Sequence, residues 1–198
     1  MGHVPVWYEV MKLYDRIRRT LLRRPFFEIA IDDFRRWRGI GMLYAAAHLA
    51  KAIKATTDQP RIGVMLPTSG LFPIALLAAW RLGRTVVPLN YLLSKEDLAF
   101  VINDAGLDAV VTIGPMLDFA GPLPDHVKVI ATEKIKYKGL PPRTRRVRMK
   151  DDEPAVILYT SGTSGRPKGV ILTAGNLSAN VDQIVEWVHF NRHDVMLG

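Results

Sequence analysis

Short apolar runs alternate with helical patterns along the middle of the chain, and this alternation limits the fold more than any other feature. Four segments predict short strands. The first, RIGVML (61–66), is expected to be buried, and the others are TVVPL (85–89), AVVTI (109–113) and VKVIAT (127–132). Between the first three lie two helical patterns, one stopping at Gly83 and one running from an N-cap at Ser94 to Gly106. Such alternation predicts crossover units. The expected fold class is α/β, a mostly parallel sheet flanked by helices.

The N-terminal region predicts two amphipathic helices. The first has arginines beside apolar residues at helical spacing: Val6, Val10, Leu13, Ile17 and Leu21. The second covers residues 40–54. A basic amphipathic helix can dock on its own domain or lie on an anionic membrane surface, and docking is the favoured interpretation.

Four parts are expected along the chain. Residues 1–38 hold the basic helix and a connector, and residues 39–133 form a first α/β subdomain. Residues 134–153, KIKYKGLPPRTRRVRMKDDE, predict a basic linker loop because they combine two prolines, dense charge and little periodicity. Residues 154–198 are expected to begin a second α/β subdomain.

The composition excludes several classes of protein. A hydrophobic fraction of 48% is typical of a folded domain, and the absence of cysteine excludes disulfides and cysteine metal sites. No secretory signal is recognisable at the N-terminus, so a cytoplasmic location is expected. The net charge of +8 favours anionic partners. The basic cluster RTRRVRMK (143–150) has no aromatic residue, which argues against nucleic acid.

A loop rich in glycine and hydroxyl groups, YTSGTSGRPKGV (159–170), joins the predicted strands AVILY (155–159) and VILT (170–173). Glycines let successive backbone N–H groups converge on an anion, hydroxyls add donors, and lysine adds a point charge. These residues predict a polyphosphate-binding loop. The alternative, a flexible polar turn, needs fewer residues and no ordered lysine. The loop is not a Walker loop, because Pro167 replaces the second glycine and a strand follows.

The stretch YTSGTSGRPKGVILTAGNL resembles the phosphate-loop signature of the acyl-adenylating superfamily, which includes acyl-CoA synthetases, nonribosomal peptide adenylation domains and luciferases. The matching residues are Thr160, Ser161, Gly162, Thr163, Gly165, Pro167, Lys168 and Gly169, with Asn176 downstream. The resemblance covers roughly residues 40–198, since the segment from 61 to 90 also looks like the family's early strand, helix and strand. Two positions depart from the pattern. Ser164 stands where threonine is usual, and Ala174 where many members have histidine, which leaves the subclass open.

The resemblance implies an ATP-dependent ligase. A carboxylic acid, with a fatty acid as the best guess, would attack the α-phosphate of ATP, and the thiol of coenzyme A or of an acyl carrier protein would take the acyl group. Mg²⁺ would neutralise the phosphates. By position, the side chains of Thr160, Ser161, Thr163, Ser164 and Lys168 would hold the phosphates, and Gly162, Gly165 and Gly169 would permit their approach. Lys168 is the catalytic candidate. The family's later regions lie beyond Gly198, so this chain alone is expected to bind phosphate weakly and to catalyse nothing.

Other candidate sites are weaker. His189 and His193 stand four residues apart, a spacing that can bind zinc, but no third ligand accompanies them, so no metal-ligating residue is predicted. Asp32 and Asp33 lie beside arginines, where charge balancing explains them, and His48 is interpreted as a packed histidine. A rival function is a non-catalytic phosphate-binding or peripheral membrane protein derived from this family, with residues 6–24 as its membrane helix.

Overall fold

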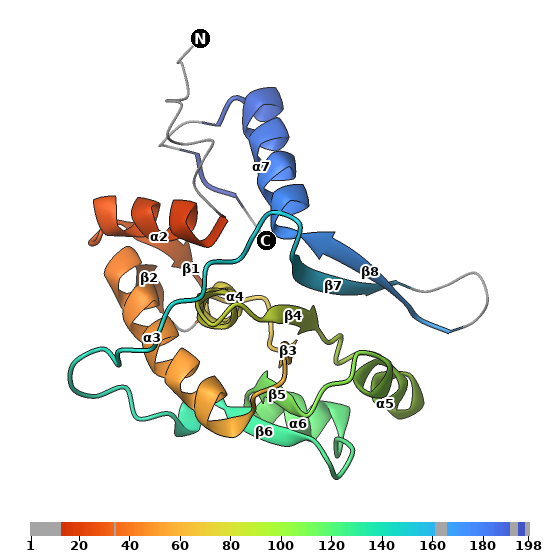
Figure 1. The fold of residues 1–198 in the computed structure, drawn as a ribbon. Helices are drawn as coiled ribbons and strands as arrows, with labels where there is room; N and C mark the ends of the chain where they lie inside the picture. Colours follow the sequence, from red (N-terminus) through yellow and green to blue (C-terminus); the bar gives the residue numbers. More distant parts are fainter. Residues whose placement is uncertain (1–12, 34, 161–165, 191–193, 197–198) are drawn as a thin grey trace.

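A six-stranded sheet forms the centre of the computed structural model, which describes residues 13–33, 35–160, 166–190 and 194–196 (Figure 1). Its strands are β3 (Arg61–Met65), β4 (Thr85–Pro88), β5 (Ala109–Thr112), β6 (Lys128–Ala131), β7 (Pro154–Thr160) and β8 (Lys168–Thr173). They lie in the order β6-β5-β3-β4-β7-β8, and every neighbouring pair is parallel except β7 and β8. The α/β class with a mostly parallel sheet is therefore confirmed.

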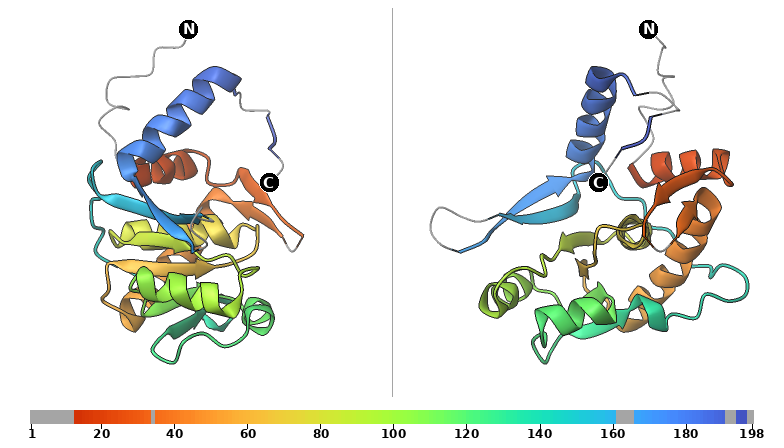
Figure 2. Two further views of the ribbon diagram at one scale, coloured as in Figure 1. Left: turned by 90° about the vertical axis from the view of Figure 1, so that its right-hand side faces the viewer. Right: turned by 180° about the vertical axis from the view of Figure 1, so that it is seen from behind.

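Helices cover both faces of this sheet (Figure 2). On one face lie α3 (Gly39–Thr56) and α4 (Leu71–Arg81), and on the other α5 (Lys95–Asp104) and the short α6 (Gly114–Ala120). The helix changes face because the chain crosses from β3 to β4 in one direction and returns to β5 in the other, and such crossovers are right-handed. Alternate residues of β3 therefore enter two cores, Ile62 and Val64 on the α3–α4 face and Met65 on the α5 face.

The basic N-terminal helix α2 (Leu13–Arg23) is docked on the domain. Leu13, Tyr14 and Leu21 are buried in the core that α3 and α4 share. Val6 and Val10, which belong to the predicted helix, lie outside the described residues. Docking, the favoured interpretation, is thus what the structure shows for residues 13–23. The apolar face that a membrane-bound helix would insert into lipid is covered by protein.

An antiparallel hairpin of β1 (Glu28–Ile31) and β2 (Arg36–Arg38) follows α2 and is not predicted by the sequence patterns. The same is true of the helix α6. Each of these two elements lines a hollow of the surface.

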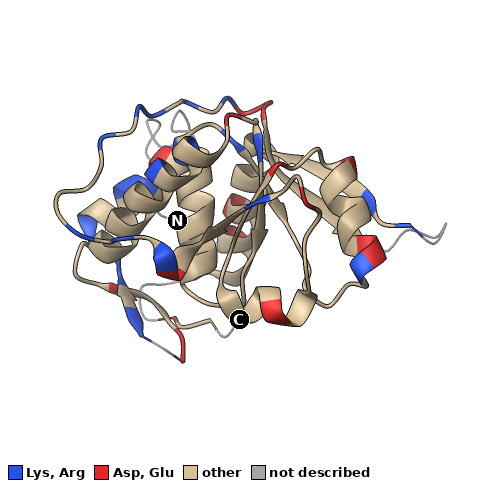
Figure 3. Ribbon diagram, turned by 90° about the horizontal axis from the view of Figure 1, so that it is seen from below, with Lys and Arg blue, Asp and Glu red and all other residues tan. Residues whose placement is uncertain are grey.

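The predicted basic linker, 134–153, starts at the last residue of a 3₁₀ turn (Thr132–Lys134) and has no helix or strand from 135 to 153. It runs along α2 and α4, carrying many of the lysines and arginines in Figure 3. Arg146 Nη1 lies 2.7 Å from Asp15 Oδ1 on α2, and the backbone N–H of Val147 donates to Arg81 O on α4 at 3.0 Å.

Beyond this linker, β7 extends the existing sheet by pairing with β4 at Val86 and Val156. The two predicted subdomains thus share one sheet, and the boundary between them stays a prediction. The last helix, α7 (Ala174–Val188), follows β8, which lies at the edge of the sheet.

Candidate phosphate-binding site

The hydroxyl- and glycine-rich loop closes the hairpin of β7 and β8. Thr160, the last residue of β7, pairs with Lys168, the first residue of β8, and Tyr159 pairs with Gly169. The predicted order of strand, loop and strand is confirmed. The structure therefore brings Thr160, Lys168 and Gly169 together at the mouth of the loop. The other predicted phosphate-binding residues, Ser161, Gly162, Thr163, Ser164 and Gly165, lie outside the described residues.

Two donors face each other across this mouth. The side chains of Thr160 and Lys168 are both exposed, and no carboxylate of the described residues pairs with the Lys168 ammonium. Lys168 is a point charge on a flexible stem, and Thr160 carries a hydroxyl that can donate. Such an ammonium and hydroxyl are the donors that an incoming phosphate needs.

Both stems of the loop are anchored to the same helix, α5. On the β7 side, the Tyr159 hydroxyl donates to Asp104 Oδ2 at 2.5 Å. On the β8 side, the guanidinium carbon of Arg166 lies 5.5 Å from the centre of the Phe100 ring. Asp104 and Phe100 are one helical turn apart, so a single face of α5 holds both ends of the loop.

Burial, followed by the hydrogen bond to Asp104, raises the pKa of Tyr159 well above its usual range. The phenol therefore stays protonated and remains a donor to the carboxylate across the physiological pH range.

Gly169 packs closely against its neighbours at the loop mouth. A Cβ at this position would lie 3.1 Å from Ile157 Cγ2 and 3.1 Å from Tyr159 Cζ, tighter than ordinary van der Waals contact. The missing side chain lets the Tyr159 ring lie against β8. The sequence motif assigns Gly169 a role in ligand approach; that role stays a prediction, and the packing provides a separate reason for glycine.

Asn176 has a structural role. Its backbone N–H donates to Thr173 Oγ1 and its Oδ1 accepts from the Thr173 N–H, both at 3.1 Å, which makes a capping box at the start of α7. Ala174, where many family members have histidine, is 1% exposed, and its N–H donates to Glu153 O. The signature residues after the loop thus build the first turn of α7.

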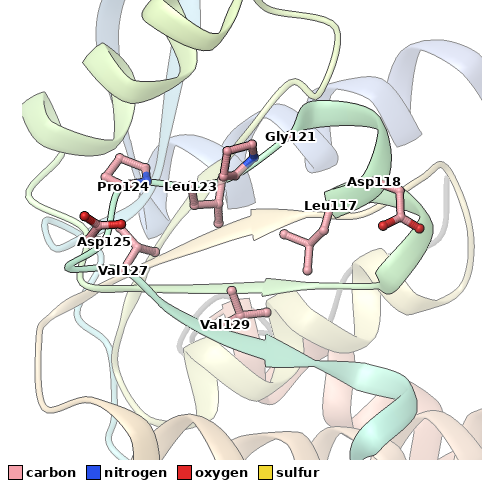
Figure 4. A pocket seen from close by; sticks show the side chains of 9 residues that line it. Leu117, Asp118, Gly121, Leu123, Pro124, Asp125, Val127 and Val129 are labelled. Atoms are coloured by element: carbon pink, nitrogen blue, oxygen red, sulfur yellow. The ribbon is translucent and has the colours of Figure 1, made fainter.

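A hollow of about 480 Å³ between α6 and β6 is not a competing phosphate site (Figure 4). Leu117 and Val129 contribute apolar surface to it, while Asp118 and Asp125 are its charged lining residues. Among the described residues no lysine or arginine lines it, and its charged lining residues are acidic, which argues against phosphate binding.

The described residues hold no group of three or more histidine, cysteine or acidic side chains placed to bind a metal ion. His189 ends α7 with φ 56°, in the left-handed region, and His193 lies outside the described residues. The same part of the chain has no helix long and apolar enough to cross a membrane.

Comparison with known proteins decides the family. The family model described as AMP-binding enzyme matches residues 23–198. The chain belongs to the AMP-binding enzyme family. The acyl-adenylating resemblance of the loop is thereby confirmed at the level of the family, and residues 23–198 of the AMP-binding chain include every described element from β1 to α7.

Curated relatives of this AMP-binding chain include biosynthetic synthases and acyl-CoA ligases. A plipastatin synthase of Bacillus subtilis is 30% identical over 76% of the chain, which corresponds to 6% of that protein. A long-chain-fatty-acid–CoA ligase of Mycobacterium tuberculosis is 32% identical over 57% of the chain and 24% of the ligase. Mouse mitochondrial malonate–CoA ligase is 28% identical over 71% of the chain and 25% of that enzyme. The AMP-binding chain thus spans a quarter or less of these relatives.

Solved structures show the same fold. The o-succinylbenzoate CoA synthetase of Bacillus subtilis superposes with a TM-score of 0.77 at 20% identity, over 93% of this chain and 38% of that one. The fatty acyl-adenylate ligase from L. pneumophila, solved with acyl adenylate and pyrophosphate, has a TM-score of 0.77 at 21% identity, over 96% and 35% of the two chains. At these identities the likeness establishes the architecture of the AMP-binding chain.

Proposed function

We propose that this chain supplies the phosphate-holding loop of an ATP-dependent acid–thiol ligase that works through an acyl-adenylate. The observation that carries the proposal is the loop mouth, where Thr160 and Lys168 face each other on the anchored β7–β8 hairpin and no described carboxylate pairs with the lysine. Membership in the AMP-binding enzyme family supports it. Ser161, Gly162, Thr163, Ser164 and Gly165 are proposed to complete the cradle, as the sequence motif predicts.

In the proposed reaction, a carboxylate oxygen of the acid bonds to the α-phosphorus of ATP, and the bond from that phosphorus to the bridging oxygen breaks. Pyrophosphate leaves with the negative charge. A thiol then attacks the acyl carbonyl carbon and releases AMP. Lys168 and the loop hydroxyls hold the β- and γ-phosphates and stabilise the charge that develops on the leaving pyrophosphate. Lys168 is therefore the catalytic residue of the proposal.

Mg²⁺ is proposed to enter together with ATP. The described residues offer no cluster of carboxylates for a resident ion, and Mg²⁺ bound by few protein groups takes its ligands from substrate phosphates and water. Bound there, the ion would neutralise phosphate charge.

The proposed acid is a fatty acid, and the proposed acceptor is the thiol of coenzyme A or of a carrier protein. The long-chain-fatty-acid–CoA ligase among the relatives supports the first of these, and a dimodular nonribosomal peptide synthase of Bacillus subtilis, also among them, is the reason for keeping the second. A cytoplasmic location, expected from the N-terminal sequence, also stays a prediction. The membrane alternative loses its main support because the apolar face of α2 is buried.

The test is pyrophosphate binding, because pyrophosphate occupies only the part of the site that the loop would hold. Calorimetry with magnesium pyrophosphate should detect weak, saturable binding to the chain. Lys168→Ala should weaken it about tenfold, the effect expected from losing one charge-assisted hydrogen bond. Lys51→Ala removes the same charge from the exposed side of α3 and should leave binding unchanged.

An equal loss of pyrophosphate affinity in the two variants would mean that only the net charge of the chain matters. Absence of binding to the unsubstituted chain would overturn the assignment of the loop as the phosphate site. With binding established, pyrophosphate release can be screened with fatty acids of different length on a protein that carries this chain within the full length of its relatives.

A further inference from the structure

A second, larger pocket lies away from the loop. It has a volume of about 800 Å³, within the range of pockets that hold drug-sized organic molecules. Its walls come from the β1–β2 hairpin, the first turns of α3, and the segments that follow β3, β5 and β6. None of Thr160, Lys168 and Gly169 lines it.

The pocket lies where an α/β sheet ordinarily binds ligands. From β3 the chain crosses to β4, whereas from the neighbouring β5 it crosses the other way to β6. Connections that diverge from adjacent parallel strands open a crevice at their carboxyl ends, and this is the usual ligand position in open α/β sheets. Pro67 and Ser69 after β3, Ile113 after β5 and Glu133 after β6 all line the pocket.

Aromatic rings form much of the wall. Trp37, Tyr44 and Tyr137 line the pocket together with the aliphatic side chains of Ile40 and Leu71. Tyr44 is held in place by a hydrogen bond from its hydroxyl to Gly139 O at 2.9 Å. The Trp37 indole is fixed by donating to Asp32 Oδ2 at 2.6 Å, so this wall is ordered before any ligand arrives.

The two acidic residues of the lining, Asp32 and Glu133, accept hydrogen bonds from neutral groups of the pocket wall. Among its partners in the described residues, Asp32 accepts from the neutral indole of Trp37 and from the backbone N–H groups of Arg35 and Gly70. Glu133 Oε1 accepts from the Gly114 N–H at 2.8 Å. Both acids are thus engaged in holding the walls of the pocket.

Two of the three lining arginines have no acidic partner in the part of the chain that the structure describes. Arg36 pairs with Glu28 at 2.9 Å. The guanidinium of Arg35 stacks on the Trp37 ring at 4.7 Å, and neither Arg35 nor Arg38 pairs with a carboxylate of the described residues. A guanidinium on an indole presents a flat cationic surface whose N–H edge can still bind a carboxylate.

We propose that this pocket binds an aromatic organic acid with one negative charge, whose ring lies among Trp37, Tyr44 and Tyr137 and whose carboxylate meets Arg35 and Arg38. Three arginines against two acids give the lining an excess of one positive charge, which a monoanion neutralises. The site is separate from the phosphate loop, and it does not depend on the ligase activity proposed above.

The chain offers a residue that can fill the pocket without disturbing the fold. Gly41 lines the pocket, lies in the first turns of α3, and a Cβ placed on it meets no atom within 4 Å. Since glycine is an unfavourable residue inside a helix, Gly41→Phe should preserve α3 while its ring occupies the ligand volume. Gly41→Ala also replaces glycine within the helix but adds only a methyl group to the pocket, so it serves as the matched control.

The experiment is calorimetric titration of the chain with biphenylcarboxylate and with the neutral biphenylmethanol. Biphenylcarboxylate should bind saturably and biphenylmethanol at least about tenfold more weakly, because it lacks the charge that the arginines recognise. Gly41→Phe should abolish binding and Gly41→Ala should retain it. Arg35→Gln and Arg38→Gln should each weaken binding about tenfold, whereas Arg145→Gln, an exposed arginine of the linker, should not.

Lys168→Ala separates this site from the phosphate loop, because binding of biphenylcarboxylate should be unchanged in that variant. Circular dichroism confirms that each variant is folded. Equal affinity for the acid and the alcohol, retained binding in Gly41→Phe, or no binding to the unsubstituted chain would each overturn the proposal.

Discussion

Tyr159 joins the strand before the loop to α5 through one hydrogen bond, and its ring occupies the space that Gly169 leaves open. Tyr159 and Gly169, both residues of the loop motif, thus contact each other. The tyrosine at the start of the motif anchors the loop, and the glycine after the lysine makes room for that anchor. A Cβ at position 169 would require the Tyr159 ring or Ile157 to shift by a few tenths of an ångström.

The raised pKa of Tyr159 predicts a loss of stability in alkali. Since the folded protein holds the phenol proton more tightly than the unfolded chain, this contribution is complete below the unfolded pKa of about 10 and falls as the pH rises above it. Urea unfolding should show a decrease in the free energy of unfolding above about pH 10, and the decrease should be smaller in Tyr159→Phe. Identical alkaline profiles for the two proteins would show that this phenol is not linked to folding.

The sequence predicts which individual residues belong to the candidate site, but it does not predict their contacts with residues distant in the chain. The motif identifies Lys168 and Thr160, because their spacing on a short loop is local information. Asp104 and Phe100 carry no signal of their own, since only the folded sheet brings α5 beside the loop. The sequence explains Asp32 by charge balancing with arginines, and in the structure it accepts from Trp37 and Gly70.

Among the elements, α7 begins with a reciprocal cap whose loss can be measured. Thr173→Ala removes the acceptor for the Asn176 N–H and should lower the free energy of unfolding by about 1 kcal/mol. Thr173→Ser retains a hydroxyl and should lose only a small part of this. Urea unfolding of the three proteins provides the comparison, and equal stability of Thr173→Ala and the unsubstituted chain would exclude a stabilising role for the cap.

The elements that the sequence predicts are those with a clear period or a continuous apolar run. The parallel strands β3, β4 and β5 are almost wholly buried, and all four strands from β3 to β6 are continuous apolar runs bounded by turn signals, so they are recognisable locally. The hairpin strand β2 is Arg36–Arg38, with a single buried tryptophan between two exposed arginines, too short to show alternation. The helix α6 has seven residues and starts with glycine and proline, so it shows no helical period either.

In the whole molecule, a buried arginine joins the first described helix to the last. Arg16 on α2 donates to Asp182 Oδ2 at 2.9 Å and also binds Asp182 Oδ1 and Ser178 on α7. The Arg16 side chain is 10% exposed and that of Asp182 is 56% exposed. The contact links residues that are 166 positions apart, so no local pattern could have predicted it.

Asp182→Asn should therefore destabilise the chain by about 1–3 kcal/mol, because it removes the negative charge that pairs with the buried Arg16 guanidinium. Glu186→Gln removes the same charge one turn further along α7 and should cost much less. Urea unfolding measures both. A similar loss in the two variants would mean that the pair adds nothing beyond the general charge of the helix.

The position of β8 at the edge of the sheet has a consequence for how copies of the chain behave in solution. Its outer backbone groups have no further strand among the described residues, and the adjoining α7 exposes Val181, Ile184 and Trp187. An open edge and exposed apolar side chains attract one another at contact, whereas a net charge of +8 repels at longer range. Salt at 0.1 M screens that repulsion beyond a Debye length of about 10 Å, whereas it leaves the attraction at contact intact. The colloidal stability of this chain is therefore electrostatic, and it should be greatest in dilute buffer.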